Sequence, residues 1–408
     1  MNLQVSHPSK VCNGVINIKG SKSISNRLLF LQSLYPLIKI LNESNSKDTL
    51  LMKHGLKSKK EVIDIGHAGT AMRFLTSYFS AIKGREIILT GSKRMQERPI
   101  KILVDALKKL GAKIFYQKKE GFPPLKIFGS NLKSKDIFLP ANISSQYISS
   151  LMLLAPFLDN GIRIELIGEI TSLPYIKMTL KLLKKLGVES FFENNIIEIS
   201  PKTEINPISY KVESDWSSAS YFYSIIALCK EGEIVLNNFN KTSIQGDSCL
   251  VNIYDLLGVS SRFDDGRLIL SKKKIEVKNV LNLNLIDSPD IAQTIAVTCF
   301  GLGLKCNLKG LHTLKIKETD RLSALKTEMT KLGSEISISD DSFHLISVKN
   351  TINKECLLNT YDDHRMAMAL APLSINSPIQ IEDFEVVKKS YPNFWDDIES
   401  IGFKVIKS

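Results

Sequence analysis

Six short polar segments in this chain contain small hydroxyl residues, glycine or an acid, four of them together with a basic residue, and an apolar run follows each of them. They are residues 20–27, 66–70, 144–146, 288–290, 317–321 and 362–365. An apolar run that begins in this way predicts a helix with a polar start. The first turn of a helix exposes unpaired N–H groups and a partial positive charge, so each segment is suited to holding an anion.

Ordinary helix capping explains any one of these segments equally well. Ser, Thr and Asp favour the N-cap for structural reasons, and Ser288 followed by Pro289 is typical of a capped start. Asp290 and Glu318 are expected in a first helical turn, where acids stabilise the helix dipole without touching any substrate. The recurrence of the pattern within one chain favours a shared anionic site over six unrelated caps.

The arginines gather near these segments, whereas the lysines are dispersed. Only 10 of the 54 basic residues are arginine, and six of them lie in or beside the polar segments: Arg27, Arg73, Arg94, Arg98, Arg321 and Arg365. The planar guanidinium matches carboxylate and phosphate groups, which lysine binds only as a point charge. A small acidic ligand is therefore indicated, with Arg73 and Arg98 as possible braces of the neighbouring loops.

The bulk composition excludes several other classes of protein. The net charge of +12 invites a nucleic-acid interpretation, but the lysines are not interleaved with aromatic residues and are typical of a solvated surface. Apolar runs such as residues 151–158 and 295–304 are too short to span a bilayer, and the N-terminus lacks a signal-peptide pattern. Six cysteines show no metal-ligand spacing. We expect a reduced cytoplasmic protein without a metal, a nucleic-acid partner or a membrane.

A repeated helix–glycine–strand pattern predicts the architecture. Six glycines, Gly55, Gly111, Gly187, Gly258, Gly333 and Gly402, are 56, 76, 71, 75 and 69 residues apart. Each is expected to be the left-handed residue that closes a helix before a strand begins. Six mixed units of about seventy residues indicate a duplicated fold, and a chain of 408 residues exceeds the usual size of one core. We expect two domains of three units, with a crossing near residues 213–215.

Seven ordered segments resemble a known family. They are GSKSISNR (20–27), AGTAMR (68–73), RMQERPI (94–100), SSQY (144–147), KETDRL (317–322), DHRMAM (363–368) and KSYPNF (389–394). In content, order and spacing they resemble the EPSP synthases of the enolpyruvyl transferase family, over nearly the whole chain. The resemblance implies a mixed α/β fold of two similar domains, each of three βαβαββ units. Residues 1–19 plus 214–408 would form one domain and residues 20–213 the other, with the active site in the cleft between them and closure on the substrates.

The implied reaction transfers the enolpyruvyl group of phosphoenolpyruvate to the 5-hydroxyl of shikimate 3-phosphate and releases phosphate through a tetrahedral intermediate. It belongs to the shikimate pathway of chorismate and aromatic amino-acid biosynthesis, and the resemblance implies a monomer that needs no metal or organic cofactor. Such a reaction requires a base for the hydroxyl, an acid for the methylene carbon, and cations for a carboxylate and two phosphates.

The resemblance also assigns roles to residues of this chain. The catalytic candidates are Asp290 as base, Glu318 for proton transfer at the methylene carbon and Lys22 as an acid. Shikimate 3-phosphate would be bound by Lys22, Ser23, Arg27, Ser144, Ser145, Gln146, Ser172, Tyr175, Asp290 and Lys317. Phosphoenolpyruvate would be bound by Lys22, Gly69, Arg94, Gln146, Arg321, Arg365 and Lys389. Residues 215–220 resemble a segment beside the domain crossing and are assigned to the hinge rather than to chemistry.

Two rival functions remain open. A sister enzyme transfers enolpyruvate to UDP-N-acetylglucosamine, but it typically has Lys-Asn in place of Lys22-Ser23 and lacks the Ser-Ser-Gln segment. A non-catalytic protein that binds anions or nucleic acid on the same scaffold is the rival from another class.

Residues 45–64 form a shorter segment than the family norm, so we expect a strand or hairpin to be missing from the first unit.

Overall fold

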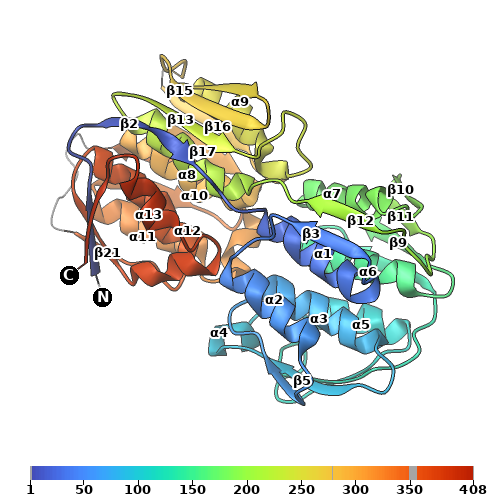
Figure 1. Cartoon of the computed structure of the whole chain (residues 1–408). Helices are drawn as coiled ribbons and strands as arrows, with labels where there is room; N and C mark the ends of the chain where they lie inside the picture. Colours follow the sequence, from blue (N-terminus) through green and yellow to red (C-terminus); the bar gives the residue numbers. More distant parts are fainter. Residues whose placement is uncertain (1, 278, 349–355, 408) are drawn as a thin grey trace. The chain divides into compact units, whose positions relative to one another are not determined.

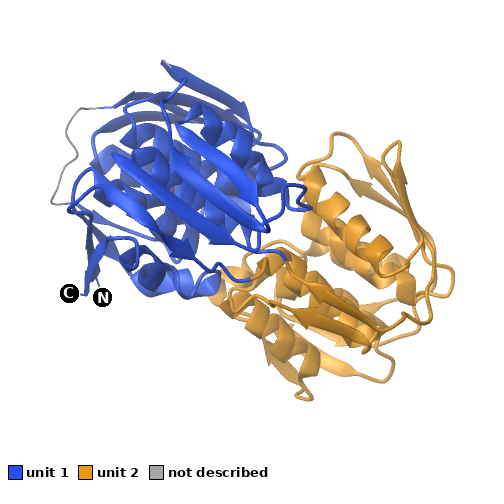
Figure 2. Cartoon of the chain, turned by 45° about the horizontal axis from the view of Figure 1, so that its top comes forward, with its two compact units in different colours: residues 1–19, 213–408 blue, residues 20–212 orange. Residues whose placement is uncertain are grey.

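The computed structural model describes residues 2–277, 279–348 and 356–407, and it divides the chain into two compact units (Figure 2). Unit 1 comprises residues 1–19 and 213–408, and unit 2 comprises residues 20–212. These units differ from the expected domains by the single residue Glu213.

Helices and strands alternate along unit 2 (Figure 1). In chain order they are α1 (Lys22–Leu34), β3 (Ile38–Leu41), α2 (Lys47–Lys57), β4 (Val62–Asp64), α3 (Gly69–Ala81), β5 (Glu86–Thr90), α4 (Lys93–Gln96), α5 (Lys101–Lys109), β6 (Lys113–Tyr116), β7 (Leu125–Phe128), β8 (Asp136–Pro140), α6 (Ser145–Leu154), the 3-10 helix η1 (Ala155–Phe157), β9 (Ile162–Ile167), α7 (Leu173–Lys185), β10 (Ser190–Glu193), β11 (Ile196–Ile199) and β12 (Ile208–Lys211).

The same alternation occurs in unit 1. Its elements are β1 (Asn2–Ser6), β2 (Val11–Ile16), α8 (Trp216–Leu228), β13 (Glu231–Asn237), η2 (Gly246–Cys249), α9 (Leu250–Leu256), β14 (Val259–Asp264), β15 (Arg267–Lys272), β16 (Val280–Asn284), η3 (Pro289–Ile291), α10 (Ala292–Gly301), β17 (Lys305–Lys309), η4 (His312–Ile316), α11 (Arg321–Lys331), β18 (Ser334–Ile338), β19 (Phe343–Val348), β20 (Leu357–Leu358), α12 (His364–Leu370), η5 (Ala371–Ile375), β21 (Ile379–Glu382), η6 (Phe384–Lys389), α13 (Phe394–Glu399) and β22 (Lys404–Lys407).

The described strands form six small sheets, five of four strands and one of two. The four-stranded sheets have the orders β4-β5-β7-β6, β10-β11-β9-β8, β14-β15-β13-β2, β16-β17-β19-β18 and β20-β21-β1-β22. In the first of them β4 and β5 pair in parallel, whereas β7 pairs antiparallel with both β5 and β6. With its intervening helices, each four-stranded sheet makes a βαβαββ unit, which confirms the predicted fold class.

The sixth sheet is the incomplete one. It contains only β3 and β12, paired in parallel from Ile38 opposite Ile208 to Leu41 opposite Lys211. Only residues 58–61 separate α2 from β4, which leaves no length for the closing hairpin of the other units. The short 45–64 segment was expected to lack a strand or hairpin, and this sheet agrees with that expectation.

Each unit has three inner helices that are buried on nearly all sides. In unit 2 they are α1, α3 and α6, and in unit 1 they are α8, α10 and α12, which contact one another within their own unit (Figure 1). Every residue of α8 except Ser217 is buried, as expected for a helix with apolar residues around its whole circumference. Small hydroxyls bond across the contacts, as Ser220 on α8 does with Thr294 on α10 at 3.2 Å.

Five of the six repeat glycines adopt the predicted left-handed conformation. Gly111, Gly187, Gly258, Gly333 and Gly402 have φ values of 99°, 77°, 87°, 100° and 105°. The prediction for Gly55 is wrong, because α2 continues through it to Lys57. A side chain at Gly55 would collide with Leu75 of α3, so this glycine permits close packing of two helices and does not end one.

Candidate active site

Several of the predicted site residues lie at the starts of inner helices, and those helices begin inside the polar segments and not after them. Three of them begin at Lys22, Gly69 and Ser145 in unit 2, and α12 begins at His364 in unit 1. The capping carboxylate of Asp363 explains the early start of α12, since it accepts a hydrogen bond from the backbone N–H of Arg365 at 2.9 Å.

One local prediction holds in part and another is wrong. Ser288 is the N-cap residue of η3 with Pro289 in the first turn, but its side chain makes no capping hydrogen bond and its hydroxyl accepts one from the Cys249 thiol at 3.5 Å. Glu318 lies in the link between η4 and α11 and not in a first helical turn, because Asp320 caps α11 by accepting from the N–H groups of Leu322 and Ser323. The Glu318 side chain is therefore not engaged as a helix cap.

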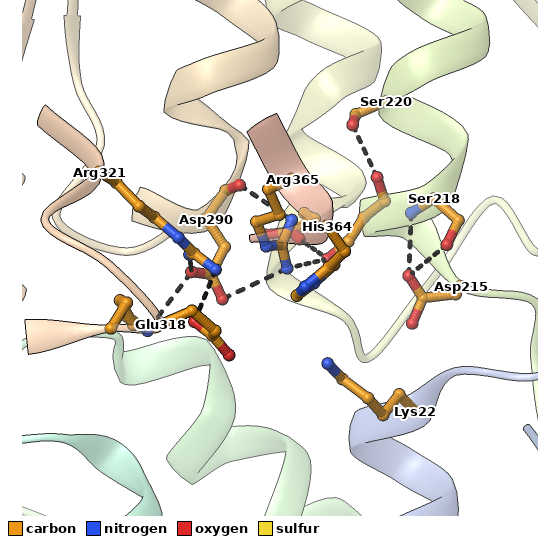
Figure 3. A network of polar contacts seen from close by, with 12 residues as sticks. Lys22, Asp215, Ser218, Ser220, Asp290, Glu318, Arg321, His364 and Arg365 are labelled. Atoms are coloured by element: carbon orange, nitrogen blue, oxygen red, sulfur yellow. Dashed lines mark hydrogen bonds and ion pairs between the residues drawn. The ribbon is translucent and has the colours of Figure 1, made fainter. Parts of the chain in front are cut away.

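Arg321 is the centre of the charged cluster in unit 1 (Figure 3). Its side chain is only 2% exposed and its guanidinium meets three carboxylates. The distances are 2.8 Å from Nη1 to Asp290, 2.9 Å from Nη2 to Glu318 and 2.7 Å from Nε to Asp363. These charge-assisted hydrogen bonds fix the positions of both acids that the sequence singled out for proton transfer.

Asp290 is held ionised by the cations around it. Burial opposes its ionisation and is the largest single influence, but Lys317, Arg365 and Arg321 together outweigh burial and hold its pKa well below its usual range. The Asp290 carboxylate lies 3.3 Å from Lys317 and 3.5 Å from Nη2 of Arg365, and its backbone carbonyl accepts from Arg365 at 2.9 Å. A carboxylate in this state accepts hydrogen bonds and can take up a proton only transiently.

Glu318 joins the cluster to the C-terminal part of unit 1. One of its carboxylate oxygens accepts from Arg321 at 2.9 Å and the other accepts from Lys389 at 2.8 Å. The side chains of Glu318 and Lys389 are 11% and 9% exposed, so both retain some access to solvent or to a ligand. Six predicted residues are thus brought together here: Asp290, Lys317, Glu318, Arg321, Arg365 and Lys389.

Two further residues of this site were missed from the sequence. Nη2 of Arg365 lies 3.4 Å from the hydroxyl oxygen of Ser217, at the start of α8, and that hydroxyl donates a hydrogen bond to buried Asp247. Ser217 belongs to the segment that was assigned to the hinge and not to chemistry. Neither residue carries a sequence signal, because the contact joins segments that are 30 and 148 residues apart.

The surroundings of Asp247 disfavour the ionised form of its carboxyl group, which gives a prediction about stability. Burial raises the pKa of Asp247 to about 6, although Arg365 and the hydrogen bond from Ser217 act in the opposite direction. A raised folded-state pKa means that ionised Asp247 destabilises the folded state as the pH rises from about 4 to 6. We expect Asp247→Asn to increase the free energy of unfolding by about 3 kcal/mol at pH 8 and by about half of that at pH 5.

Urea unfolding of both proteins at the two pH values measures this difference, with Asp159→Asn, at an exposed acid, as the matched control. A variant that is no more stable than the wild type at pH 8 would show that the ionised carboxylate is well accommodated.

Arg27 of unit 2 is enclosed by polar partners of its own unit. Its Nε donates to Thr179 at 2.8 Å, Nη1 donates to the Ser23 carbonyl at 2.9 Å and Nη2 donates to Ser149 at 2.9 Å. The guanidinium also lies 5.8 Å from the centre of the Tyr175 ring. Three of its N–H groups are thereby used, and a guanidinium has five, so two remain to meet a carboxylate.

The starts of α3 and α6 meet in the same unit. Ser144 caps α6 by accepting from the N–H of Gln146 at 3.4 Å, and the Gln146 amide donates to Thr70 of α3 at 3.2 Å. Gly69, at the start of α3, accepts from Arg73 through its carbonyl at 3.2 Å. Arg73 also donates to the Pro99 carbonyl at 3.1 Å, which is the bracing contact that was expected of it.

A Cβ at Gly69 would lie 2.7 Å from Nη1 of Arg98, so a larger residue there would require that guanidinium to shift. Ser145 and Ser172 are both buried, and Ser172 precedes α7 with a left-handed φ of 57°. Such a conformation is uncommon outside glycine and Asn, and it is found often at ligand-binding positions.

The two remaining candidates of unit 2 are paired with acids. Nζ of Lys22 lies 3.2 Å from the carboxylate of Asp48, and these side chains are 19% and 6% exposed. Nη1 of Arg94 lies 3.3 Å from Glu97, and the Arg94 side chain is 36% exposed. Both cations therefore have a carboxylate that an anionic substrate would have to displace.

Within residues 2–277, 279–348 and 356–407 no group of three or more His, Cys, Asp or Glu side chains could hold a metal ion. In that same part of the chain no helix is long and apolar enough to cross a membrane.

Known proteins resemble this chain along nearly its whole length. A sequence model of EPSP synthase (3-phosphoshikimate 1-carboxyvinyltransferase) matches residues 37–398. The 3-phosphoshikimate 1-carboxyvinyltransferase of Bacteroides fragilis is 44% identical over 409 residues, which cover 99% of both chains. That of Buchnera aphidicola is 36% identical and covers 97% of this chain and 96% of the relative. The structure of an EPSP synthase from Acinetobacter baumannii superimposes with a TM-score of 0.76 at 20% identity, covering 100% of both chains.

Proposed function

The chain belongs to the EPSP synthase family, and we infer that it catalyses the reaction for which its relatives are named, joining phosphoenolpyruvate to the 5-hydroxyl of shikimate 3-phosphate. It is a transferase of the shikimate pathway, which supplies aromatic amino-acid biosynthesis. The observation that supports the chemistry most directly is the pairing of Arg321 with Asp290 and Glu318, because both acids needed for proton transfer are fixed by one buried cation.

The reaction proceeds in two balanced steps. In the first, the 5-hydroxyl oxygen forms a bond to C2 of phosphoenolpyruvate, the hydroxyl proton passes to a base, and C3 gains a proton to become a methyl group. In the second, the bond between C2 and the phosphate oxygen breaks, phosphate leaves, and the methyl group loses a proton. We propose Asp290 as the base for the hydroxyl and Glu318 as the group that exchanges protons with C3, with Lys22 as a second acid.

Phosphoenolpyruvate binding is proposed to rest on cations that are already oriented by acids. Arg365 contacts Asp290, Lys389 contacts Glu318, and Arg321 contacts both acids. An incoming carboxylate and phosphate would supply new anionic partners for these three cations. The cations would then stabilise the ionised carboxylates of Asp290 and Glu318 less strongly. Weaker stabilisation of the ionised form makes both carboxylates better proton acceptors, as the two steps require.

We propose that unit 2 supplies most of the groups for shikimate 3-phosphate, and that Asp290 and Lys317 of unit 1, which are 3.3 Å apart, supply the rest. The carboxylate of this substrate would take the two remaining N–H groups of Arg27 together with Ser23, and its 3-phosphate would bind Ser144, Ser145 and Ser172 beside Tyr175. The support is that hydroxyls and helix N–H groups suited to a phosphate gather at the start of α6.

We propose further that Gly69, Arg94 and Gln146 of unit 2 complete the phosphoenolpyruvate site. The active site would then draw its groups from both units. We also propose that the enzyme acts as a monomer in the cytoplasm.

A phosphate-release assay tests this function and separates it from both rivals. Phosphate release from phosphoenolpyruvate is measured with shikimate 3-phosphate or with UDP-N-acetylglucosamine as the acceptor. We expect release with the shikimate ester alone. Release with the nucleotide sugar would establish the sister activity, and release with neither acceptor would refute the proposed function and return attention to a non-catalytic anion-binding role.

A further inference from the structure

We propose that Asp247 and Ser217 are positioning residues for Arg365, and that they orient its guanidinium toward phosphoenolpyruvate through one buried chain of hydrogen bonds. This inference rests on the proposed function, and it concerns two residues that neither the sequence motifs nor the reaction chemistry single out. Neither is proposed to touch a substrate.

The hydrogen bonds run in one direction, from Arg365 through Ser217 to Asp247. Arg365 donates from Nη2 to the oxygen of Ser217 at 3.4 Å, and the Ser217 hydroxyl donates to Oδ2 of Asp247. Because Asp247 accepts the single proton of the hydroxyl, the lone pairs of the Ser217 oxygen are left facing Arg365. Nη1 of Arg365 is fixed separately by the Asp290 carbonyl at 2.9 Å. The plane of the guanidinium is thus held at both terminal nitrogens, and Nη2 lies between the Ser217 hydroxyl and the Asp290 carboxylate, which is 3.5 Å away.

Three segments that are distant in sequence make this arrangement. Ser217 lies in the first turn of α8, Asp247 lies on η2 and Arg365 lies on the first turn of α12. Since Ser217 is the one residue of α8 that is not buried, its hydroxyl is at the end of an otherwise enclosed helix. A hydroxyl there can be fixed by buried Asp247 and can in turn fix the guanidinium of Arg365.

The energetic position of Asp247 favours a functional role over a structural one. Its side chain is buried, and Oδ1 has no hydrogen-bond partner among the described residues. A buried carboxylate with an unused oxygen destabilises a fold. The other charged and titratable groups that act on it are Arg365, Asp290 and Asp215, and burial together with Asp247 raises the pKa of the neighbouring Cys249 thiol. Two of these neighbours are acids, which add to the cost of its charge.

A residue that reduces stability yet is embedded beside the active site is expected where function requires it. A purely structural role predicts that stability and activity fall together when Asp247 is changed. A positioning role predicts that they separate in Asp247→Ala, because an alanine carries no charge to bury but has no oxygen to accept from the Ser217 hydroxyl.

The decisive experiment is a double-mutant cycle on steady-state kinetics of the full-length enzyme. We expect Asp247→Ala and Ser217→Ala each to raise the KM for phosphoenolpyruvate about tenfold and to leave the KM for shikimate 3-phosphate within twofold. The double variant should be no worse than either single variant, because both remove the same chain of hydrogen bonds. Effects that multiply in the double variant, or that fall equally on both substrates, would overturn the proposal.

Two conservative variants guard against simple misfolding. Ser217→Thr retains the hydroxyl, and Asp247→Asn retains an oxygen that can accept from it, so both should recover most of the phosphoenolpyruvate affinity. An Asp247→Asn enzyme that is both less stable and less active than the wild type would indicate a structural role and contradict the proposal. Wild-type enzyme that releases no phosphate would instead refute the proposed function itself, so the two failures are distinguishable.

Discussion

Glu318→Gln is expected to lower kcat by about 10²- to 10⁴-fold, the usual contribution of a positioned proton-transfer group. Glutamine has nearly the same shape as glutamate, and its amide oxygen can still accept from Arg321 or Lys389, which lie 2.9 and 2.8 Å from the carboxylate. What it cannot do is carry a proton to and from C3 of phosphoenolpyruvate. The loss should therefore appear in kcat and not in the affinity for shikimate 3-phosphate.

The measurement is phosphate release under saturating substrates, with binding of shikimate 3-phosphate followed by calorimetry. Glu385→Gln is the matched control, because Glu385 is an exposed glutamate that pairs with Lys388 on the same 3-10 helix. A Glu318→Gln enzyme that retains a third or more of wild-type kcat would remove Glu318 from the proton-transfer step.

Arg321→Met is expected to destabilise the fold by about 3–5 kcal/mol and to abolish use of phosphoenolpyruvate. Methionine fills much of the space of the arginine stem but leaves the carboxylates of Asp290, Glu318 and Asp363 without their shared cation. Removal of one partner from a buried ion pair costs more than the pair itself contributes, because an uncompensated charge remains.

The pH dependence distinguishes this cause from a simple packing defect. Without Arg321 the pKa of Asp290 should rise, because that guanidinium is one of three cations that hold it below its usual range. Asp290 can then be protonated more easily, so the loss of stability should shrink as the pH falls from 8 to 5. Unfolding in urea at the two pH values measures this, and an equal loss at both would indicate lost packing alone.

Arg321→Lys provides the matched comparison. A lysine ammonium is a point charge and cannot meet three carboxylates in one plane as the guanidinium fork does. We expect stability between those of the wild type and Arg321→Met, with activity close to that of Arg321→Met. Activity near the wild-type value in Arg321→Lys would show that charge alone, without the fork, is sufficient.

The repeat architecture could be predicted from the sequence because its signal is local. Gly111, Gly187 and their equivalents require a left-handed backbone at a fixed place in each unit, and few other residues provide it. Gly55 shows the limit of that argument, since a glycine can be needed for the close approach of a neighbouring helix as well as for its own φ. The pattern alone does not distinguish the two causes.

The candidate site was predictable in its membership but not in its connections. Asp290, Glu318 and Arg321 follow from motifs, yet their convergence on one guanidinium depends on side chains from separate segments meeting in space. Ser217 and Asp247 had no signal at all, because a serine in a helix start and a buried aspartate are individually ordinary. Only the tertiary contact with Arg365 sets them apart.

The most direct test of the central claim is to run the reaction with phosphoenolpyruvate and shikimate 3-phosphate in D₂O and to determine the deuterium content of the product by mass spectrometry. Addition to C2 with protonation of C3, followed by elimination, predicts one phosphate released for each product formed and deuterium in the new methylene group. Phosphate release without a condensed product, or a product free of deuterium after many turnovers, would contradict enolpyruvyl transfer by addition and elimination.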